Sequence, residues 1–261
     1  MYRYTLVILF SFLFVIGFSQ TTQSGSVSQE KEMEQGDIIP SMSAFYAFEL
    51  AAGDLSNRFG FNHKIGAAFS LKLKKNWVLT FEVGYMFGQD LKKEAYSVLD
   101  PLKTKNGQIT SKYGTPGSIL LGERGYTLMF KGGKILPFLQ TNKNSGPMLQ
   151  GGIGFLQHKI RIDNAGNDTP QVSDDYKNGY DRLTNGIAFS EFIGYRHYAN
   201  NKMSNFYIGI EWTQALTQNR RAYNYDSMEY DNIKRLDMLY SVKAGIVIPF
   251  SRRAPKEFYA Y

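Results

Sequence analysis

Cysteine is absent from this chain of 261 residues, and histidine occurs only three times. The lack of cysteine excludes disulfide bonds, thiolate metal sites, a cysteine nucleophile and a lipid anchor on an N-terminal cysteine. A lipid deacylase would need a histidine base beside a serine nucleophile, together with an acidic residue that orients the base. No serine lies two residues from His63, His158 or His197. We therefore expect a protein that is not an enzyme.

The sequence also has no clear pattern for a metal or a cofactor. Residues 163–168, Asp-Asn-Ala-Gly-Asn-Asp, have the density of acids and amides found in cation-binding loops. They lack the regular alternation of ligands and the distal glutamate of a calcium loop. We expect a polar turn there, no metal site and no cofactor.

Only one long hydrophobic run is present. Residues 5–18 are apolar except for one serine, Arg3 precedes them, and Gly17 and Ser19 provide small residues before a cleavage at Gln20. A basic start, an apolar run and small residues in this order predict a signal peptide. The run is shorter than the roughly 20 residues that a membrane-spanning helix needs. We predict a signal peptide over residues 1–19, followed by a polar, flexible leader over residues 20–37.

Acidic residues are fewer than basic ones, and the formal net charge is +7. No basic cluster with interleaved stacking aromatics occurs, so we expect no nucleic-acid partner. An exported basic protein would instead meet anionic lipid head groups and lipopolysaccharide. The mean hydropathy of −0.32 is low for a helical membrane protein, whereas 15% aromatic residues and 25 glycines are many. This combination is typical of strands with one lipid-facing and one lumen-facing side.

From residue 38 onward, apolar and polar residues alternate. Because successive side chains of a strand point to opposite faces, this period of two predicts β-strands with one wholly apolar face. The runs are longer than the five or six residues usual in soluble proteins, and their length suits a tilted membrane crossing. We predict an all-β, transmembrane, antiparallel up-and-down barrel over residues 38–250. The strands are expected at residues 40–51, 59–73, 77–88, 122–132, 147–162, 183–197, 205–217 and 237–250.

Several features of this pattern leave alternatives open. A different division of residues 118–138 would give ten strands instead of eight. In the fifth strand the apolar side changes between Phe155 and Leu156, which indicates either a bulge or an end that leaves the membrane. Glu191 falls on the apolar side of the sixth strand, which indicates a bulge or a site covered by a partner. Long polar connections alternate with shorter ones, so we expect both termini in the periplasm.

The last strand carries the most specific motif. Lys243 is followed by Gly245, Ile248 and Phe250 at the spacing of polar, glycine and apolar residues found at the end of bacterial outer-membrane barrels. The chain resembles the small eight-stranded barrels related to OmpX, OmpA and OmpW, in the form common in Bacteroidota. The resemblance implies an outer-membrane location and recognition of this strand by the barrel-insertion machinery. Unlike the usual pattern, eleven residues follow Phe250.

The predicted lumen contains charges of both signs at mid-strand. An eight-stranded barrel is just wide enough to be filled by its own side chains, and unpaired buried charges are costly. We therefore predict a structural ion-pair network that fills the lumen; a path for protons or ions is the alternative. The predicted network comprises Glu49, Lys64, Glu82, Lys131, Glu211 and Lys243.

Function is expected to lie outside the barrel, because no catalytic set is present and the lumen is predicted to be filled. Residues 218–236 mix aromatic and charged side chains as a contact surface does, and residues 251–261 form an aromatic tail. We predict an accessory or structural subunit of an envelope complex, such as outer-membrane protein assembly or secretion machinery. A channel for small or hydrophobic solutes and a lipid-modifying enzyme are the alternatives. The predicted partner contacts are Arg220, Arg221, Tyr223, Tyr225, Tyr230, Phe258, Tyr259 and Tyr261.

Overall fold

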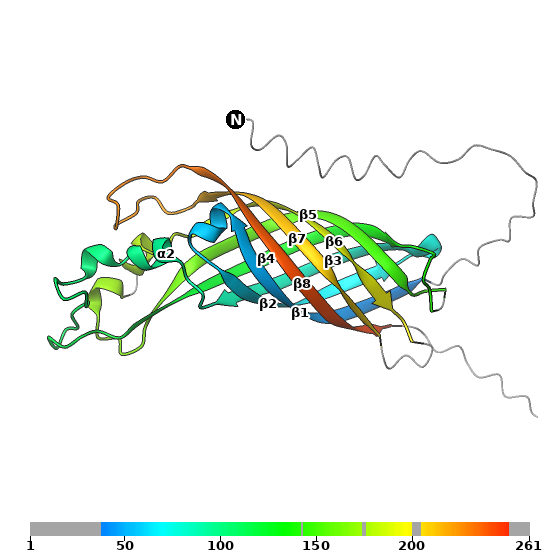
Figure 1. Ribbon diagram of the computed structural model, residues 1–261, viewed down its shortest axis with the longest axis horizontal. Coiled ribbons are helices and arrows are strands. Elements are labelled where there is room, and N and C mark those ends of the chain that lie inside the picture. The colour runs from blue at the N-terminus through cyan, green and yellow to red at the C-terminus, as the bar shows by residue number, and fades with distance from the viewer. Residues whose placement is uncertain (1–37, 142, 174–175, 200–204, 251–261) are drawn as a thin grey trace, which may run out of the picture. The chain divides into compact units, whose positions relative to one another are not determined.

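The computed structural model describes residues 38–141, 143–173, 176–199 and 205–250. These residues form eight strands that pair in sequence order and close into a barrel, as Figure 1 shows. Every strand is antiparallel to its neighbours, including β1 to β8 at the seam. The predicted all-β, up-and-down barrel of eight strands is confirmed, and the division into ten strands is wrong. The predicted signal peptide, leader and aromatic tail lie outside the described residues.

The strands are long and staggered around the barrel. A row of hydrogen-bonded neighbours that starts at Met42 passes through all eight strands and returns to β1 at Ala52, ten residues later. Such a stagger accompanies strands that tilt relative to the barrel axis. The strands are β1 (Ile39–Gly53), β2 (Phe61–Lys72), β3 (Trp77–Gly88), β4 (Ile119–Ile135), β5 (Gly146–Asn164), β6 (Thr184–His197), β7 (Phe206–Asn219) and β8 (Lys234–Pro249).

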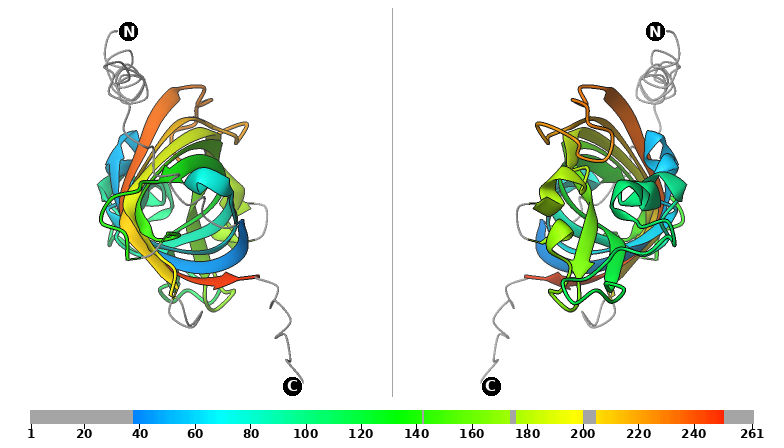
Figure 2. Two further views of the ribbon diagram at one scale, coloured as in Figure 1. Left: turned by 90° about the vertical axis from the view of Figure 1, so that its right-hand side faces the viewer. Right: turned by 90° about the vertical axis from the view of Figure 1, so that its left-hand side faces the viewer.

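The two ends of the barrel differ, as the views in Figure 2 show. At the terminal end, where β1 begins and β8 ends, the strands are joined by residues 73–76, 136–145 and 198–205. At the loop end, residues 89–118, 165–183 and 220–233 connect them, and a shorter connection spans residues 54–60. The loop end carries the helix α2 (Lys93–Ser97) and the 3-10 helices η1 (Asp54–Asn57), η3 (Asp100–Leu102), η4 (Pro170–Val172) and η5 (Tyr176–Gly179). Within the described ranges, no helix is both long and apolar enough to span a membrane.

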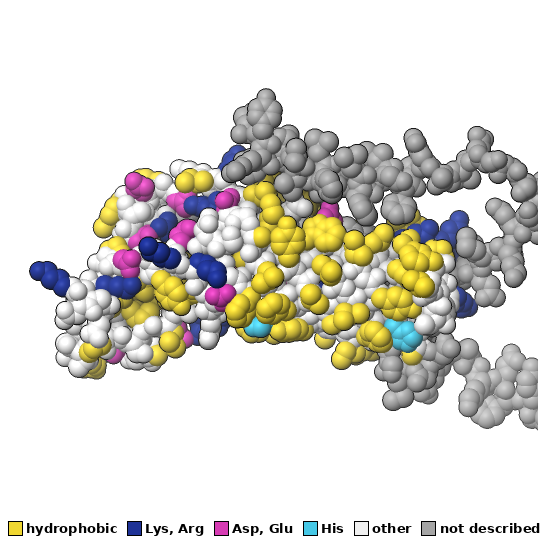
Figure 3. All heavy atoms as spheres, viewed as in Figure 1, with side chains coloured by type: hydrophobic (Ala, Val, Ile, Leu, Met, Phe, Trp, Pro, Cys, Tyr) yellow, Lys and Arg dark blue, Asp and Glu magenta, His cyan; other side chains and the backbone are white. Residues whose placement is uncertain are grey.

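The outer wall of the barrel is apolar. Alternation places large hydrophobic side chains on the outside of every strand, whereas most inward positions are small or polar. Figure 3 shows the resulting apolar surface over the strands and the charged surface at the loop end. Exposed examples, one from each strand in order, are Phe48, Phe69, Phe81, Phe130, Ile153, Phe189, Ile210 and Val242.

In β5 the apolar residues face outward in the first part of the strand and inward in the second part, yet the strand contains no bulge. The pairing of β5 with β4 continues one residue at a time from Met148 to Asn164, so a bulge near Phe155 is wrong. Phe155 points outward, whereas Leu156, Ile160 and Ile162 are buried inside the barrel. This part of β5 therefore has an apolar interior and a polar exterior, as expected where a strand rises beyond the apolar belt.

Two further expectations about the outer face are corrected. A bulge at Glu191 is wrong, because Glu191 pairs in regular register with Gly151 on β5 and Trp212 on β7. Phe59 was expected as the first residue of the second strand, yet β2 begins at Phe61 and Phe59 is fully buried at the loop end. Phe59 packs in an apolar cluster that includes residues of the loops. The alternation alone could not show that a loop covers this position.

Candidate functional site

The structure brings the six predicted lumen charges together in one cluster, here called the charged core. Alternation directs all six side chains inward, from β1, β2, β3, β4, β7 and β8. Each of these residues is at most 2% exposed. The members are Glu49, Lys64, Glu82, Lys131, Glu211 and Lys243.

Glu211 holds the charged core together. Its Oε1 lies 3.1 Å from Lys64 Nζ, and its Oε2 lies 3.0 Å from Lys243 Nζ. Lys131 donates a hydrogen bond to the same Oε2. Glu211 accepts hydrogen bonds from all three lysines. Loss of Glu211 would therefore leave more positive charge unpaired than loss of Glu49 or Glu82.

The other two glutamates balance the remaining charge. Glu82 Oε2 lies 3.1 Å from Lys131 Nζ and 2.5 Å from Lys243 Nζ. Glu49 Oε1 lies 2.7 Å from Lys64 Nζ. Three carboxylates thus meet three ammonium groups, so the cluster has no net charge. Buried charges are tolerated when they are paired in this way.

Small residues make room for the long side chains of the charged core. A Cβ atom on Gly84 would lie 2.9 Å from Lys64 Cδ, so the lysine stem crosses the barrel over a position without a side chain. Lys243 Nζ lies 4.1 Å from the centroid of the Phe45 ring, within range of a cation–π interaction. The hollow beside the charged core measures about 10 Å³, roughly the space of a single water molecule.

Apolar side chains fill the barrel on the terminal side of the charged core. A buried cluster there includes Ile39, Phe45, Ile135, Phe192, Tyr207 and Val247. Arg196 is buried beside it, donates a hydrogen bond to Ser41 Oγ at 3.0 Å and lies over the ring of Tyr198. The charged core is therefore covered by packed side chains on this side.

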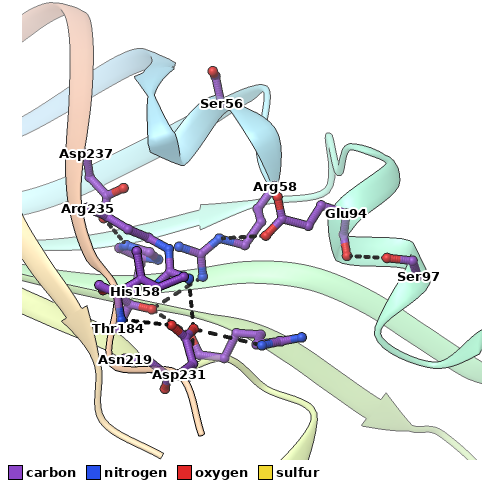
Figure 4. A network of polar contacts seen from close by, with 12 residues as sticks. Ser56, Arg58, Glu94, Ser97, His158, Thr184, Asn219, Asp231, Arg235 and Asp237 are labelled. Atoms are coloured by element: carbon purple, nitrogen blue, oxygen red, sulfur yellow. Dashed lines mark hydrogen bonds and ion pairs between the residues drawn. The ribbon is translucent and has the colours of Figure 1, made fainter. Parts of the chain in front are cut away.

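A second polar group, which sequence reasoning missed, lies toward the loop end (Figure 4). His158 Nε2 lies 2.8 Å from Asp237 Oδ2, and Thr217 donates to the same oxygen at 2.5 Å. Arg58, which lies in the connection formed by residues 54–60, donates a hydrogen bond to Thr184 Oγ1 at 3.3 Å. Burial lowers the pKa of Arg58, and the nearby Asp237 carboxylate offsets part of this effect. These five residues are the outer polar cluster.

The outer polar cluster contains an acid and a histidine but lacks the geometry of a hydrolase. His158 and Asp237 are fully buried. The His158 ring packs edge-on against Phe59, with 5.8 Å between ring centroids, and no described side chain forms a hydrogen bond with its Nδ1. A nucleophile would have to occupy that side of the ring. His158 points inward because regular alternation continues through β5, whereas a bulge near Phe155 would have turned it outward.

The part of the chain that the structure describes contains no group of three or more histidine, aspartate or glutamate residues placed to hold a metal ion. The predicted polar turn at residues 163–168 is a hydrogen-bonded turn: Asn164 Oδ1 accepts from the Asp168 backbone N–H at 3.3 Å. The side-chain N–H of Asn164 donates to the Thr169 carbonyl at 3.0 Å. The side-chain amide of Asn164 therefore serves the turn itself.

The long loops pack into an ordered cap over the barrel. Its apolar centre joins loop residues such as Leu91, Val98, Val172 and Tyr180 to inward residues of the strands. Arg221 ties two loops together, because its Nε and Nη2 donate to both carboxylate oxygens of Asp181, at 2.8 and 2.5 Å. Hydrogen bonding to Asp181 raises the pKa of Arg221. Among the described residues, two buried apolar clusters, the charged core and the outer polar cluster occupy the interior between the terminal end and this cap.

The predicted partner contacts fall into three groups. Arg220 and Arg221 form hydrogen bonds within the chain, Arg220 with Asn185 at 2.5 Å. Tyr223 lies between Tyr225 and Tyr230, with ring centroids 6.3 and 5.1 Å away, and Tyr230 is 73% exposed. The structure therefore presents a surface group of tyrosines on residues 220–233. The third group, Phe258, Tyr259 and Tyr261, lies outside the described residues.

The predicted assembly motif divides between the two faces of the final strand. Lys243 points into the charged core, and Gly245 faces the ring of Tyr207, which would lie 2.6 Å from a Cβ atom at that position. Ile248 and Phe250 are exposed on the outside. The polar residue and the glycine thus have packing roles inside the barrel, whereas the two apolar residues face outward.

The closed antiparallel ring of eight strands defines the chain as a small up-and-down β-barrel protein. No protein-family model matches the sequence, and no curated protein matches it. Among solved structures, Ail, the attachment invasion locus protein of Yersinia pestis, is 10% identical, with a TM-score of 0.44 over 82% of this chain and 100% of Ail. Neisserial surface protein A is 12% identical, with a TM-score of 0.42 over 81% of this chain and 97% of that protein. AlkL, solved in lipid bilayers, is 11% identical, with a TM-score of 0.37 over 90% of this chain and 100% of AlkL.

Proposed function

We propose that this protein is an integral β-barrel of the bacterial outer membrane with a closed lumen, and that it acts as an accessory subunit of an envelope complex. It would work through its loop cap and its aromatic tail, with both termini in the periplasm. The observation that carries the proposal is the filled interior, in which the charged core occupies the middle of the barrel. Because packed side chains occupy the interior of the described barrel, we assign its function to the outer surfaces.

The membrane location rests on the outer wall. Large apolar side chains face outward on all eight strands, while the lysines and glutamates of the charged core face inward and are buried. A soluble protein would expose the charges and bury the apolar residues. The reversed arrangement fits hydrocarbon outside the barrel, and a closed barrel leaves no unpaired strand edge in the membrane.

The interior argues against the two alternative functions. A solute channel needs a continuous opening, whereas the charged core leaves a hollow of only about 10 Å³. A lipid-modifying enzyme needs a histidine that can reach both a nucleophile and a lipid. His158, which pairs with an acid, is fully buried and points away from the outer wall.

The accessory role rests on the tyrosines of residues 220–233. Tyrosine is enriched at protein interfaces because its ring buries a large area and its hydroxyl still forms hydrogen bonds. Tyr230 and Met228 are 73% and 69% exposed, although they belong to a loop that is ordered by hydrogen bonds. A fixed loop that exposes large side chains loses little freedom when it binds a partner.

The experiment is isolation of the tagged full chain from its own membranes in mild detergent. We expect a stoichiometric protein partner with the wild type and loss of that partner with Tyr223→Ser/Tyr230→Ser. Tyr113→Ser is the matched control, because Tyr113 is also 73% exposed but belongs to residues 89–118. A second variant, Phe258→Ser/Tyr259→Ser, tests the tail separately. Recovery of a pure monomer in several mild detergents would contradict the accessory role.

A further inference from the structure

An open hollow of about 390 Å³ lies on the outer wall of the barrel, over β3, β4 and β5. Its position is separate from the charged core and the tyrosines of the loop cap. Three of the lining side chains are cationic and form what we call the cationic ledge: Arg124, Lys159 and Arg161. The other lining residues are Tyr85, Tyr126 and Gln157.

The register of the strands explains why these side chains gather. Tyr85 pairs with Tyr126, and Tyr126 pairs with Gln157, which forms one row across the three strands. In the next row toward the loop end, Arg124 pairs with Lys159. Residues two apart on a strand share a face, so Arg161 follows Lys159 on the outside, opposite Gly122. Glycine leaves open space beside the arginine.

The order of side chains along the strands matches the depth profile of a membrane interface. On β4, the outward residues pass from Leu128 through Tyr126 to Arg124, and the first two are 44% and 54% exposed. The rings of Tyr85 and Tyr126 lie 5.2 Å apart at their centroids. Tyrosine collects where hydrocarbon meets the head groups. The cations lie two residues beyond the tyrosines along the strands, a distance of about 7 Å. This step places them at the depth of the charged lipid groups.

The charges of the cationic ledge are not fully balanced by the protein. Arg124 donates from Nη1 to the Glu123 carbonyl at 2.7 Å, and among the described residues no carboxylate pairs with it. Lys159 Nζ lies 3.5 Å from Asp181, which already accepts two hydrogen bonds from Arg221. Arg161 pairs with Asp163 at 2.5 Å, but both side chains are more than 40% exposed. An anion would therefore find a net positive, accessible surface.

We propose that the cationic ledge binds the phosphate groups of a phosphorylated glycolipid in the outer leaflet. The forked guanidinium of Arg124 supplies several donors for one phosphate, and Lys159 and Arg161 add charge on the neighbouring strand. The tyrosine row and Leu128 lie where the sugar and the first part of the acyl chains of the same lipid would pass. The inference rests on the proposed outer-membrane location but is independent of the accessory role.

The test uses the full chain in bilayer nanodiscs and measures bound lipid A by native mass spectrometry. Bisphosphorylated lipid A is the probe, dephosphorylated lipid A is its matched control, and inorganic phosphate is the competitor. The variant is Arg124→Gln/Lys159→Gln/Arg161→Gln. The control variant, Lys92→Gln/Lys103→Gln/Lys112→Gln, removes the same charge from residues 89–118. We expect the ledge variant to bind roughly 100-fold more weakly and the control variant to change by only a few-fold.

Each other outcome overturns a defined part of the account. Equal binding by the wild type and the ledge variant, or equal losses in both variants, would overturn the cationic ledge as a site. Equal binding of phosphorylated and dephosphorylated lipid A would overturn the role of the phosphate. Displacement by millimolar inorganic phosphate would overturn a lipid as the source of the anion. A folded barrel that enters no bilayer would instead overturn the outer-membrane location.

Discussion

Lys243 Nζ lies 2.5 Å from Glu82 Oε2, although 161 residues separate the two in the sequence. Lys243 is on β8 and Glu82 on β3, so the pair spans the interior of the barrel. β8 reaches this position only when it pairs with β1 at the seam. The charged core is therefore complete only in the closed barrel, and it links closure of the sheet to filling of the lumen.

Glu211 is predicted to matter more for stability than Glu49. Glu211→Gln removes the carboxylate that contacts all three lysines, whereas Glu49→Gln affects Lys64. We expect Glu211→Gln to lower the free energy of unfolding by about 3–5 kcal/mol, as when one partner of a buried ion pair is lost. Adding Lys131→Met restores neutrality and should recover part of this loss. Urea unfolding in lipid vesicles, followed by the fluorescence of Trp77 and Trp212, gives the free energy of unfolding of the wild type, the two single variants and the double variant. Equal losses for the two single variants would contradict the central position of Glu211.

Gly245 is predicted to be needed for the fit of Tyr207. A methyl group at Gly245 would lie 2.6 Å from Cε1 and Cζ of the Tyr207 ring. Gly245→Ala should therefore slow folding into vesicles and lower stability by about 1–3 kcal/mol, the usual cost of overpacking. Tyr207→Leu should relieve the clash, so the double variant should be closer to the wild type than Gly245→Ala is. Gel mobility of folded and unfolded chain follows the reaction. Failure of Tyr207→Leu to relieve the defect would show that the glycine has another role.

His158 and Asp237 are predicted to act as one unit. Their side chains are fully buried and 2.8 Å apart. Asp237→Asn and His158→Gln should each destabilise the loop end by about 1–3 kcal/mol, because each leaves a buried group without its partner. A double-mutant cycle measured by hydrogen exchange should give a coupling energy of about 0.5 kcal/mol or more. Strictly additive losses would contradict a direct interaction.

The loop cap is predicted to loosen in acid. Burial alone would raise the pKa of Asp231. The hydrogen bond from Arg235 and its positive charge lower this pKa by more, so it lies below its ordinary value. A carboxylate with a lowered folded pKa contributes stability above its unfolded pKa and loses it as pH falls through the folded value. Hydrogen-exchange protection of residues 220–233 should therefore decline below about pH 4. Asp231→Asn should reduce protection at neutral pH and flatten the decline. Asp100→Asn, in another loop, serves as the control, and an unchanged acid decline in Asp231→Asn would contradict the assignment.

The strand pattern could be predicted because alternation is a local property of the sequence. β3 coincides with the predicted residues 77–88, and the inward lysines and glutamates follow from counting by two along each strand. Prediction was weakest where a strand passes beyond the apolar belt. There the interior becomes apolar and the exterior polar, so Leu156 is buried inside the barrel although the apolar residues earlier in β5, such as Ile153 and Phe155, face outward.

Contacts between loops could not be derived from the sequence. Arg221 and Asp181 lie 40 residues apart in segments without periodicity, and only the folded cap brings them together. Phe59 shows the same limit, because its burial depends on residues 89–118 folding over the barrel. The cationic ledge was missed for a related reason. Its members belong to two strands, and only the register places Arg124 beside Lys159.

Single-channel conductance in planar bilayers tests the closed lumen most directly. The full chain, shown to be folded by its gel mobility, is compared with Lys131→Ala/Glu211→Ala, which removes two side chains from the charged core without changing its net charge. We predict no unitary current steps from the wild type and defined steps from the variant. Steady unitary currents from the folded wild type, equal to those of the variant, would contradict a lumen closed by the charged core.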